Sequence, residues 1–118
     1  AAILAKAVAE DAAAFDAFSA LRAATLGGAK AIGFDHLVGS LEPGKQADIA
    51  CVDLSALETQ PLHHVVSQLI YATGRQQVSD VWIAGKPKLS ARVLVDMDMD
   101  RIIANAKQWR GRIAAIGR

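Results

Sequence analysis

The side chains of this sequence best suited to metal or acid–base chemistry are its three histidines, His36, His63 and His64. A hydrolytic metal site needs imidazole and carboxylate ligands that close on one ion and leave a position open for water. Adjacent histidines point in different directions on a helix or a strand, so His63 and His64 form a poor chelating pair. The sequence contains no His-x-His or His-Glu-x-x-His pattern. We therefore assign no metal ligand to this chain and expect its histidines at the surface or in loops.

No nucleophile stands out among the hydroxyl and thiol side chains. None of the serines lies in a Gly-x-Ser-x-Gly elbow. Ser67 and Gln68 are expected to form hydrogen bonds from a helix surface to a neighbouring domain, and Tyr71 to lie at an interface. Cys51 is expected to be a small buried residue of a strand. We assign no catalytic and no cofactor-binding residue to this chain.

One stretch partly matches a phosphate-binding loop. Gly39, Gly44 and Lys45 have the spacing of the first part of that pattern, but Gln46 stands where Ser or Thr should bind Mg²⁺. Glu42 would repel phosphate, and a proline follows it within the loop. A strand pattern follows in place of a helix. Nucleotide binding is therefore disfavoured, and Lys45 and Lys30 are expected to be solvated charges.

The same stretch predicts a turn that leads into a strand. Pro43 and Gly44 suit the two central positions of a type II turn over residues 42–45. The apolar run that follows predicts a strand over residues 48–54. A brief pairing is expected over residues 38–41.

Residues 1–33 read as helices because they are rich in alanine. Asp16 is the expected N-cap of a second segment. Thr25 is expected to cap a further short helix after a kink at residues 25–28, and Gly33 is expected to end it.

The remaining elements alternate between helix and strand. We expect a loop over residues 55–62, a helix from Pro61 to residue 72 with Gly74 just past its end, and a strand over residues 78–83. A turn at residues 85–86 leads to a returning strand at residues 88–89, which Pro87 should confine to a sheet edge, and residues 91–95 give one more strand. Trp82 is expected to pack in the core or anchor a docking surface.

The last segment predicts a long helix. Aspartates crowd its start and arginines its end, as the helix dipole favours. Apolar side chains recur at helical spacing and give a docking face for a larger body; they are Met99, Ile102, Ile103, Ala106, Trp109 (or Arg110 at that position), Ile113 and Ile116.

Composition excludes several classes of partner. The 118 residues carry a net charge of +1 and 5% aromatic residues, which provides no electrostatic or stacking surface for nucleic acid. No stretch has the pattern of a signal peptide or a membrane span. A single cysteine cannot form an internal disulfide, so a cytoplasmic setting is expected. Because the sequence begins inside a helical pattern, we expect a piece of a longer protein.

Two blocks, at residues 24–33 and 39–49, resemble the C-terminal end of the metal-dependent amidohydrolases. The likeness is greatest to the branch of methylthioadenosine/S-adenosylhomocysteine deaminases, N-ethylammeline chlorohydrolases and triazine hydrolases. Further matches lie at residues 59–61, 66–72 and 78–87. In that family the metal ligands lie upstream of the matched region, so none is carried over to this chain.

The resemblance implies an α/β fold made of parts of two domains. Residues 1–33 would be the last helices of a (β/α)₈ barrel, residues 34–96 part of a composite β-sandwich, and residues 97–118 a C-terminal helix that docks back on the barrel. It implies zinc or another divalent metal held outside this chain, and a metal-activated water that displaces ammonia or chloride from a heteroaromatic ring. It also implies a homo-oligomer, and an isolated segment without activity.

Two alternatives stay open. The chain could be a free-standing module without catalysis that dimerises through the apolar stripes at residues 3–8 and 99–116. Upstream coding sequence that reaches a His-x-His stretch would instead support the enzyme. Binding of nucleotide through residues 39–45 is the third hypothesis, and titration with labelled ATP tests it.

Overall fold

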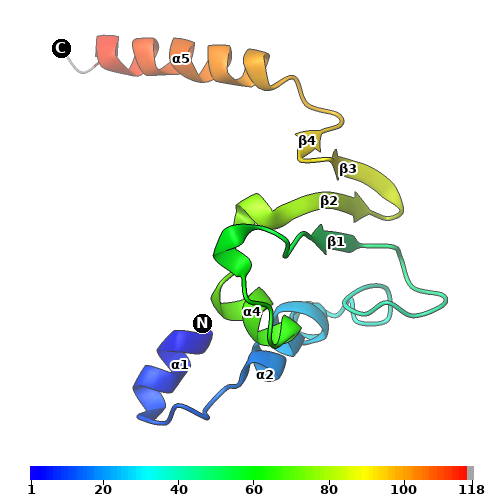
Figure 1. The fold of residues 1–118 in the computed structure, drawn as a ribbon. Helices are drawn as coiled ribbons and strands as arrows, with labels where there is room; N and C mark the ends of the chain where they lie inside the picture. The colour runs from blue at the N-terminus through cyan, green and yellow to red at the C-terminus, as the bar shows by residue number, and fades with distance from the viewer. Residues whose placement is uncertain (117–118) are drawn as a thin grey trace.

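A computed structural model describes residues 1–116 of the chain (Figure 1). Its first part is helical, as expected, with α1 (Ala2–Ala9), α2 (Ala17–Arg22), a π-helical segment (Ala23–Gly27) and α3 (Gly28–Ala31). The Asp16 carboxylate accepts a hydrogen bond of 2.7 Å from the backbone N–H of Ser19, which confirms the predicted N-cap of α2. Gly33 has a φ of +76° and ends α3, also as predicted.

The kink expected near residue 25 takes the form of the π-helical segment. Thr25 lies inside this segment and is not a cap, since its Oγ1 donates 2.8 Å to the carbonyl oxygen of Leu21 one turn earlier. This bond to the preceding turn is the common alternative for a threonine within a helix. The prediction of Thr25 as a cap was therefore wrong.

Four strands form one antiparallel sheet in the order β1-β2-β3-β4. They are β1 (Ile49–Val52), β2 (Val78–Ile83), β3 (Lys86–Ser90) and β4 (Val93–Leu94). The turn between β2 and β3 has positive φ at Ala84 and Gly85, the pattern of a type I′ hairpin, and so lies one residue before the predicted position. The strand that contains Pro87 was predicted to lie at a sheet edge, but β4 pairs with Leu89 and Ser90 of β3. Pro87 itself has no partner in β4.

Two sequence predictions about strands were wrong. Residues 38–41 form no strand, because Gly39 has a φ of +95° and lies against the helical segment. Cys51 is exposed, and no residue of β1 is fully buried, so its side-chain face is not covered by the described residues.

The segment between β1 and β2 contains a 3₁₀ turn (Leu57–Thr59) within the predicted loop, α4 (Val65–Tyr71) and a second 3₁₀ turn (Arg75–Gln77). Helix α4 does not begin at Pro61 as predicted, because His64 is its N-cap. Gly74 is not the left-handed residue that ends α4, since it is extended and precedes the second 3₁₀ turn. The hydroxyl of Thr73 instead donates 2.9 Å to the carbonyl oxygen of Gln68 at the end of α4.

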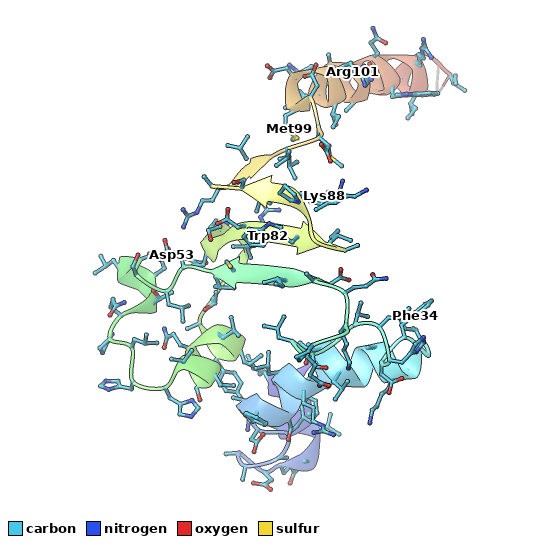
Figure 2. The ribbon with its side chains drawn as sticks, turned by 90° about the vertical axis from the view of Figure 1, so that its right-hand side faces the viewer. Phe34, Asp53, Trp82, Lys88, Met99 and Arg101 are labelled. Carbon is cyan, nitrogen blue, oxygen red and sulfur yellow. The ribbon has the colours of Figure 1, made fainter. Side chains whose placement is uncertain are left out.

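The chain ends in α5 (Met99–Ile116), the predicted long helix. The Asp98 carboxylate accepts a hydrogen bond of 2.9 Å from the backbone N–H of Arg101 at its start. Figure 1 shows α5 beyond β4, on the far side of the sheet from α1 and α2, and Figure 2 shows the same order of elements from another side. The docking of residues 97–118 on a barrel stays a prediction.

The described residues bury very little apolar surface. The buried hydrophobic residues are Ala2, Ala17, Ala20 and Ala29, and the largest fully buried side chain is that of Thr59. The radius of gyration is 18.8 Å, against about 13.5 Å for a compact chain of this length. No helix among residues 1–116 combines the length and the apolar character needed to cross a membrane.

Candidate functional site

Some of the residues that resemble a known family lie together where the helical segment, the loop after it and the β2–β3 turn meet. We call this part the turn cluster: residues 24–29, 39–48 and 84–85. Within it Gly39 lies directly on the helical segment. A Cβ atom on Gly39 would lie 2.8 Å from Cβ of Ala29 and 3.0 Å from Cα of Leu26. The two sequence blocks therefore belong together because their backbones touch at a position that only glycine fits.

In the loop of residues 39–45 the charged side chains contact partners within the same loop. The predicted turn is confirmed, with Gly44 at a φ of +91° and a hydrogen bond of 3.1 Å from the N–H of Lys45 to the carbonyl oxygen of Glu42. The Lys45 ammonium donates 2.7 Å to Ser40 Oγ and lies 3.9 Å from the Glu42 carboxylate. Lys45 was expected to be solvated, but these contacts cover it. Its partners lie inside the loop, which argues against a phosphate cradle.

Asp48 connects this loop to the sheet. Its Oδ1 accepts a hydrogen bond of 2.6 Å from the backbone N–H of Ala84, and the N–H of Gly85 donates 3.0 Å to the carbonyl oxygen of Ala47. Both contacts hold the type I′ turn between β2 and β3. Asp48 therefore has a structural partner in the hairpin turn.

A second polar group lies between β1 and the 3₁₀ turns. The buried hydroxyl of Thr59 donates to the carbonyl oxygens of Leu54 and Ala56 at 2.8 and 2.7 Å. The buried amide of Gln77 donates 2.7 Å to Glu58 and accepts 2.9 Å from the N–H of Gly74. These bonds fix irregular backbone beside the sheet, and sequence reasoning missed them because three of the four partners are backbone groups.

Asp53 and Arg92 form the best-connected ion pair of the described residues. The guanidinium of Arg92 donates 2.9 Å to Asp53 Oδ2 and 3.1 Å to the carbonyl oxygen of Gln76. Hydrogen bonds from the hydroxyl and the N–H of Ser55, together with Arg92, lower the pKa of Asp53 to about 2. The pair holds the β3–β4 turn to the end of β1, and sequence reasoning missed it as well.

The three histidines do not come together. His36 and His63 are exposed, and His64 Nδ1 accepts a hydrogen bond of 3.2 Å from the N–H of Ser67 as the cap of α4. Ser67 Oγ lies 3.1 Å from the same nitrogen, so Ser67 has a partner within the chain. Hydrogen bonds from Ser67 and Gln68 to a neighbouring domain stay a prediction. Among residues 1–116, no group of three or more His, Cys, Asp or Glu side chains could hold a metal ion.

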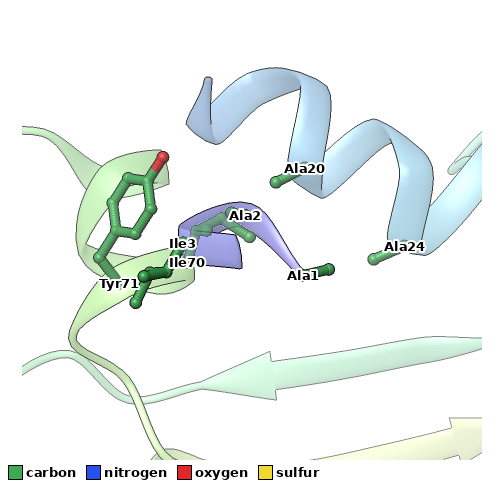
Figure 3. A pocket seen from close by; sticks show the side chains of 7 residues that line it. All are labelled: Ala1, Ala2, Ile3, Ala20, Ala24, Ile70 and Tyr71. Carbon is green, nitrogen blue, oxygen red and sulfur yellow. The ribbon is translucent and has the colours of Figure 1, made fainter. Parts of the chain in front are cut away.

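A hollow of about 270 Å³ opens where α1, α2 and α4 meet (Figure 3). Its lining is mainly apolar and includes Ile3, Ala20 and Ile70. Tyr71 borders it and is 40% exposed, with its ring 5.9 Å from the Lys6 ammonium. The lining offers no set of convergent polar groups that would orient a small substrate. The placement of Tyr71 at an interface stays a prediction.

Comparison with known proteins shows the family to which the chain belongs. The sequence model of the amidohydrolase family matches residues 1–88, about three quarters of the chain. The chain belongs to the amidohydrolase family.

Its curated relatives include several 5-methylthioadenosine/S-adenosylhomocysteine deaminases. That of Teredinibacter turnerae is 50% identical over 115 residues, which are 98% of this chain and 26% of the relative. That of Saccharophagus degradans is 36% identical over the same shares. The chain therefore spans about a quarter of the length of the curated relatives that it matches.

Solved structures show the same arrangement of elements. An adenosine deaminase from Xanthomonas campestris with bound zinc is 71% identical, with a TM-score of 0.93 over 97% of this chain and 26% of that one. Atrazine chlorohydrolase TrzN from Arthrobacter aurescens TC1, complexed with zinc, is 32% identical, with a TM-score of 0.74 over 80% of this chain and 21% of that one. The resemblance found in the sequence is thus confirmed.

Proposed function

We propose that this chain is the C-terminal segment of a metal-dependent amidohydrolase that hydrolytically deaminates a purine-like ring. The observation that carries the proposal is the likeness to a zinc-containing adenosine deaminase, with 71% identity and a TM-score of 0.93 over 97% of the chain. The relatives named as methylthioadenosine/S-adenosylhomocysteine deaminases support the same class of substrate. Dechlorination of a triazine is the second candidate, and the similarity to atrazine chlorohydrolase supports it more weakly, at 32% identity.

The segment is proposed to support the active site without contributing to its chemistry. Zinc, or another divalent metal, supplies a polarised water in hydrolases of this kind. The described residues do not fit a metal site, and their carboxylates at Asp48 and Asp53 are bonded to backbone and to Arg92. The ligands are therefore proposed to come from the rest of the protein, and no step of the reaction is assigned to this chain.

The domain organisation is proposed from the same likeness. Residues 1–33 would be the last helices of a (β/α)₈ barrel, and residues 34–96 would complete a small composite β-sandwich. Residues 97–118 would form a C-terminal helix that docks back on the barrel. The parent protein is proposed to be cytoplasmic, because its one cysteine in this region serves no disulfide.

The large accessible surface of the chain, and the apolar residues on it, agree with a segment that packs against a larger body. The accessible surface is 9027 Å², whereas a compact monomer of 12.4 kDa exposes about 6,100 Å². Helix α1 alone presents Ile3, Leu4 and Val8 to solvent with at least two thirds of each residue exposed. Patches of this kind mark surfaces that another segment or subunit covers.

The proposal is tested by assaying the complete protein with zinc for release of ammonia from methylthioadenosine, S-adenosylhomocysteine and adenosine. Release of chloride from a chlorotriazine is measured in parallel. We expect ammonia release to have the higher kcat/KM. Turnover of the chlorotriazine alone would favour the second candidate, and turnover of no ring would contradict both.

A further inference from the structure

We propose that Thr25 is a positioning residue for the turn cluster. Its hydroxyl holds the π-helical segment in its wide form, and Gly39 packs on that segment. In this way Thr25 sets where the loop of residues 39–48 and the sheet lie relative to the helices. The proposal goes beyond the proposed function, because the role is independent of the ring on which the complete protein acts.

The glycines of the π-helical segment show how its backbone is wound. An α-helix joins each N–H to the carbonyl four residues earlier, whereas a π-helix joins it to the carbonyl five residues earlier. A Cβ atom on Gly27 would lie 3.1 Å from the carbonyl oxygen of Arg22, which is five residues earlier. A Cβ atom on Gly28 would lie 3.4 Å from the carbonyl oxygen of Ala23, at the same separation. The wide winding therefore leaves less room for a side chain at residue 27 than at residue 28.

The hydroxyl of Thr25 bonds to the helical turn directly before it. It donates 2.8 Å to the carbonyl oxygen of Leu21 and lies 3.5 Å from that of Arg22. Backbone carbonyls change their partners where a helix passes from α to π winding, and a carbonyl left without a donor costs free energy. A side chain that inserts into the backbone bonds of a helix is a known cause of local distortion. The hydroxyl of Thr25 therefore favours the wide winding over a regular α-helix.

The neighbouring glycines permit this winding but do not select it. Glycine adopts many backbone conformations with similar ease, so Gly27 and Gly28 remove steric barriers without favouring one form. The Thr25 bond is directional and joins two specific atoms of the chain. We therefore expect the hydroxyl, and not the glycines alone, to decide between the two windings.

The winding decides which part of the helix faces Gly39. A Cβ atom on Gly39 would lie 3.0 Å from Cα and 3.3 Å from the backbone nitrogen of Leu26, the residue next to Thr25. It would lie 2.8 Å from Cβ of Ala29 in the following turn. One residue of an α-helix corresponds to a rotation of about 100° about its axis. A return to α winding would therefore turn Leu26 and Ala29 away from the backbone that now touches them.

The contact at Gly39 continues through the loop to the sheet. The N–H of Gln46 donates 2.8 Å to the carbonyl oxygen of Leu37 and so closes the loop. Asp48 then accepts from the N–H of Ala84 in the turn between β2 and β3. Figure 1 shows this loop between the helical part of the chain and β1. A change of winding at Thr25 is therefore expected to reach residues 39–48, and not to stay within the helix.

The experiment measures backbone amide exchange of the complete protein by mass spectrometry, in peptides that cover residues 22–31 and residues 37–48. Thr25→Val keeps the branched shape of the side chain and removes the hydroxyl, whereas Thr25→Ser keeps the hydroxyl. Thr73→Val is the matched control, because the hydroxyl of Thr73 also bonds to a helix carbonyl, that of Gln68 at the end of α4.

We expect Thr25→Val to make exchange about fivefold faster in both peptides, the effect of losing one hydrogen bond of ordinary strength. Thr25→Ser should restore slow exchange, and Thr73→Val should leave both peptides unchanged. Faster exchange in residues 22–31 alone would overturn the coupling to the loop. Equal exchange of the Val and Ser variants would overturn the role of the hydroxyl. No readout depends on turnover, so failure of this proposal is distinguishable from failure of the proposed function.

A second pair of variants tests the winding without a change at Thr25. Alanine favours a regular α-helix at either glycine, but the wide winding brings the Arg22 carbonyl oxygen close to a Cβ at residue 27. We therefore expect Gly27→Ala to speed exchange in both peptides and Gly28→Ala to leave it equal or slower. Slower exchange in both variants would indicate α winding and would overturn the proposal even if Thr25→Val failed to fold.

Discussion

The turn cluster and α5 show two different ways in which one chain uses its residues. In the turn cluster, Gly39, Lys45 and Asp48 each meet a specific partner within the chain, at the helical segment, at Ser40 and at Ala84. In α5 the apolar residues recur at helical spacing, yet every residue from Met99 to Ile116 is exposed.

The difference distinguishes residues that make contacts within the chain from residues whose apolar side chains are left exposed. The turn cluster lies wholly inside the part that the amidohydrolase model matches, and α5 lies wholly outside it. The residues of the turn cluster therefore shape the backbone and connect the helices to the sheet. Exposed apolar residues, by contrast, identify the surfaces where we propose that other polypeptide binds.

The largest predicted effect is that of a side chain at Gly39. Gly39→Val should lower the free energy of unfolding of the complete protein by roughly 3 kcal/mol, from the clash with Ala29 and Leu26 and from strain at positive φ. Urea denaturation measures it. Gly44→Val is the matched control, since its φ is +91° but a Cβ there meets nothing within 4 Å. Equal losses at the two positions would show that contact with the helical segment is unimportant.

A smaller effect is expected at Asp48. Asp48→Ala removes the acceptor of the Ala84 N–H and should reduce the free energy of unfolding by about 1 kcal/mol. Asp48→Asn keeps an acceptor oxygen and should lose less. If the Asn and Ala variants lost the same free energy of unfolding in urea, the hydrogen bond to the hairpin turn would not account for the stability that Asp48 contributes.

The smallest effect is expected from the Asp53–Arg92 pair, and it depends on pH. Because the folded protein holds the pKa of Asp53 at about 2, below its value of about 3.9 in unfolded chains, the ionised carboxylate stabilises the fold above about pH 4. This stabilisation is lost as the pH falls toward 2. Asp53→Asn should therefore be less stable than the unmodified protein at pH 6, and the difference should shrink on acidification. A difference that stays constant down to pH 2 would contradict the assignment.

Local rules predicted those elements whose signals lie close together in the sequence. Asp16 three residues before Ser19, and Pro43 next to Gly44, each determine their own cap or turn, and the structure confirms both. The long last helix also followed from its spacing and its acidic start.

The wrong predictions arose where a distant or less usual partner decided the structure. Gly39 is held by the helical segment and not by a strand partner, and α4 begins at His64 because an imidazole nitrogen caps it in place of the more usual hydroxyl or carboxylate. Cys51 looked buried from its apolar neighbours, but the exposure of a strand side chain depends on which elements pack on its face of the sheet, and these lie far away in the sequence. For the candidate site, the sequence pattern led to the family, while the contacts of Asp48 and Arg92 join residues far apart in the chain and left no local signal.

The central claim is that the residues of this chain support an amidohydrolase site and do not bind its metal. It is tested most directly by the zinc content and deaminase turnover of the complete protein in which His36→Gln, His63→Gln and His64→Asn are combined; the asparagine keeps an N-cap for α4. We predict the same zinc stoichiometry and the same turnover as in the unmodified protein. Loss of zinc from a correctly folded variant would contradict the account.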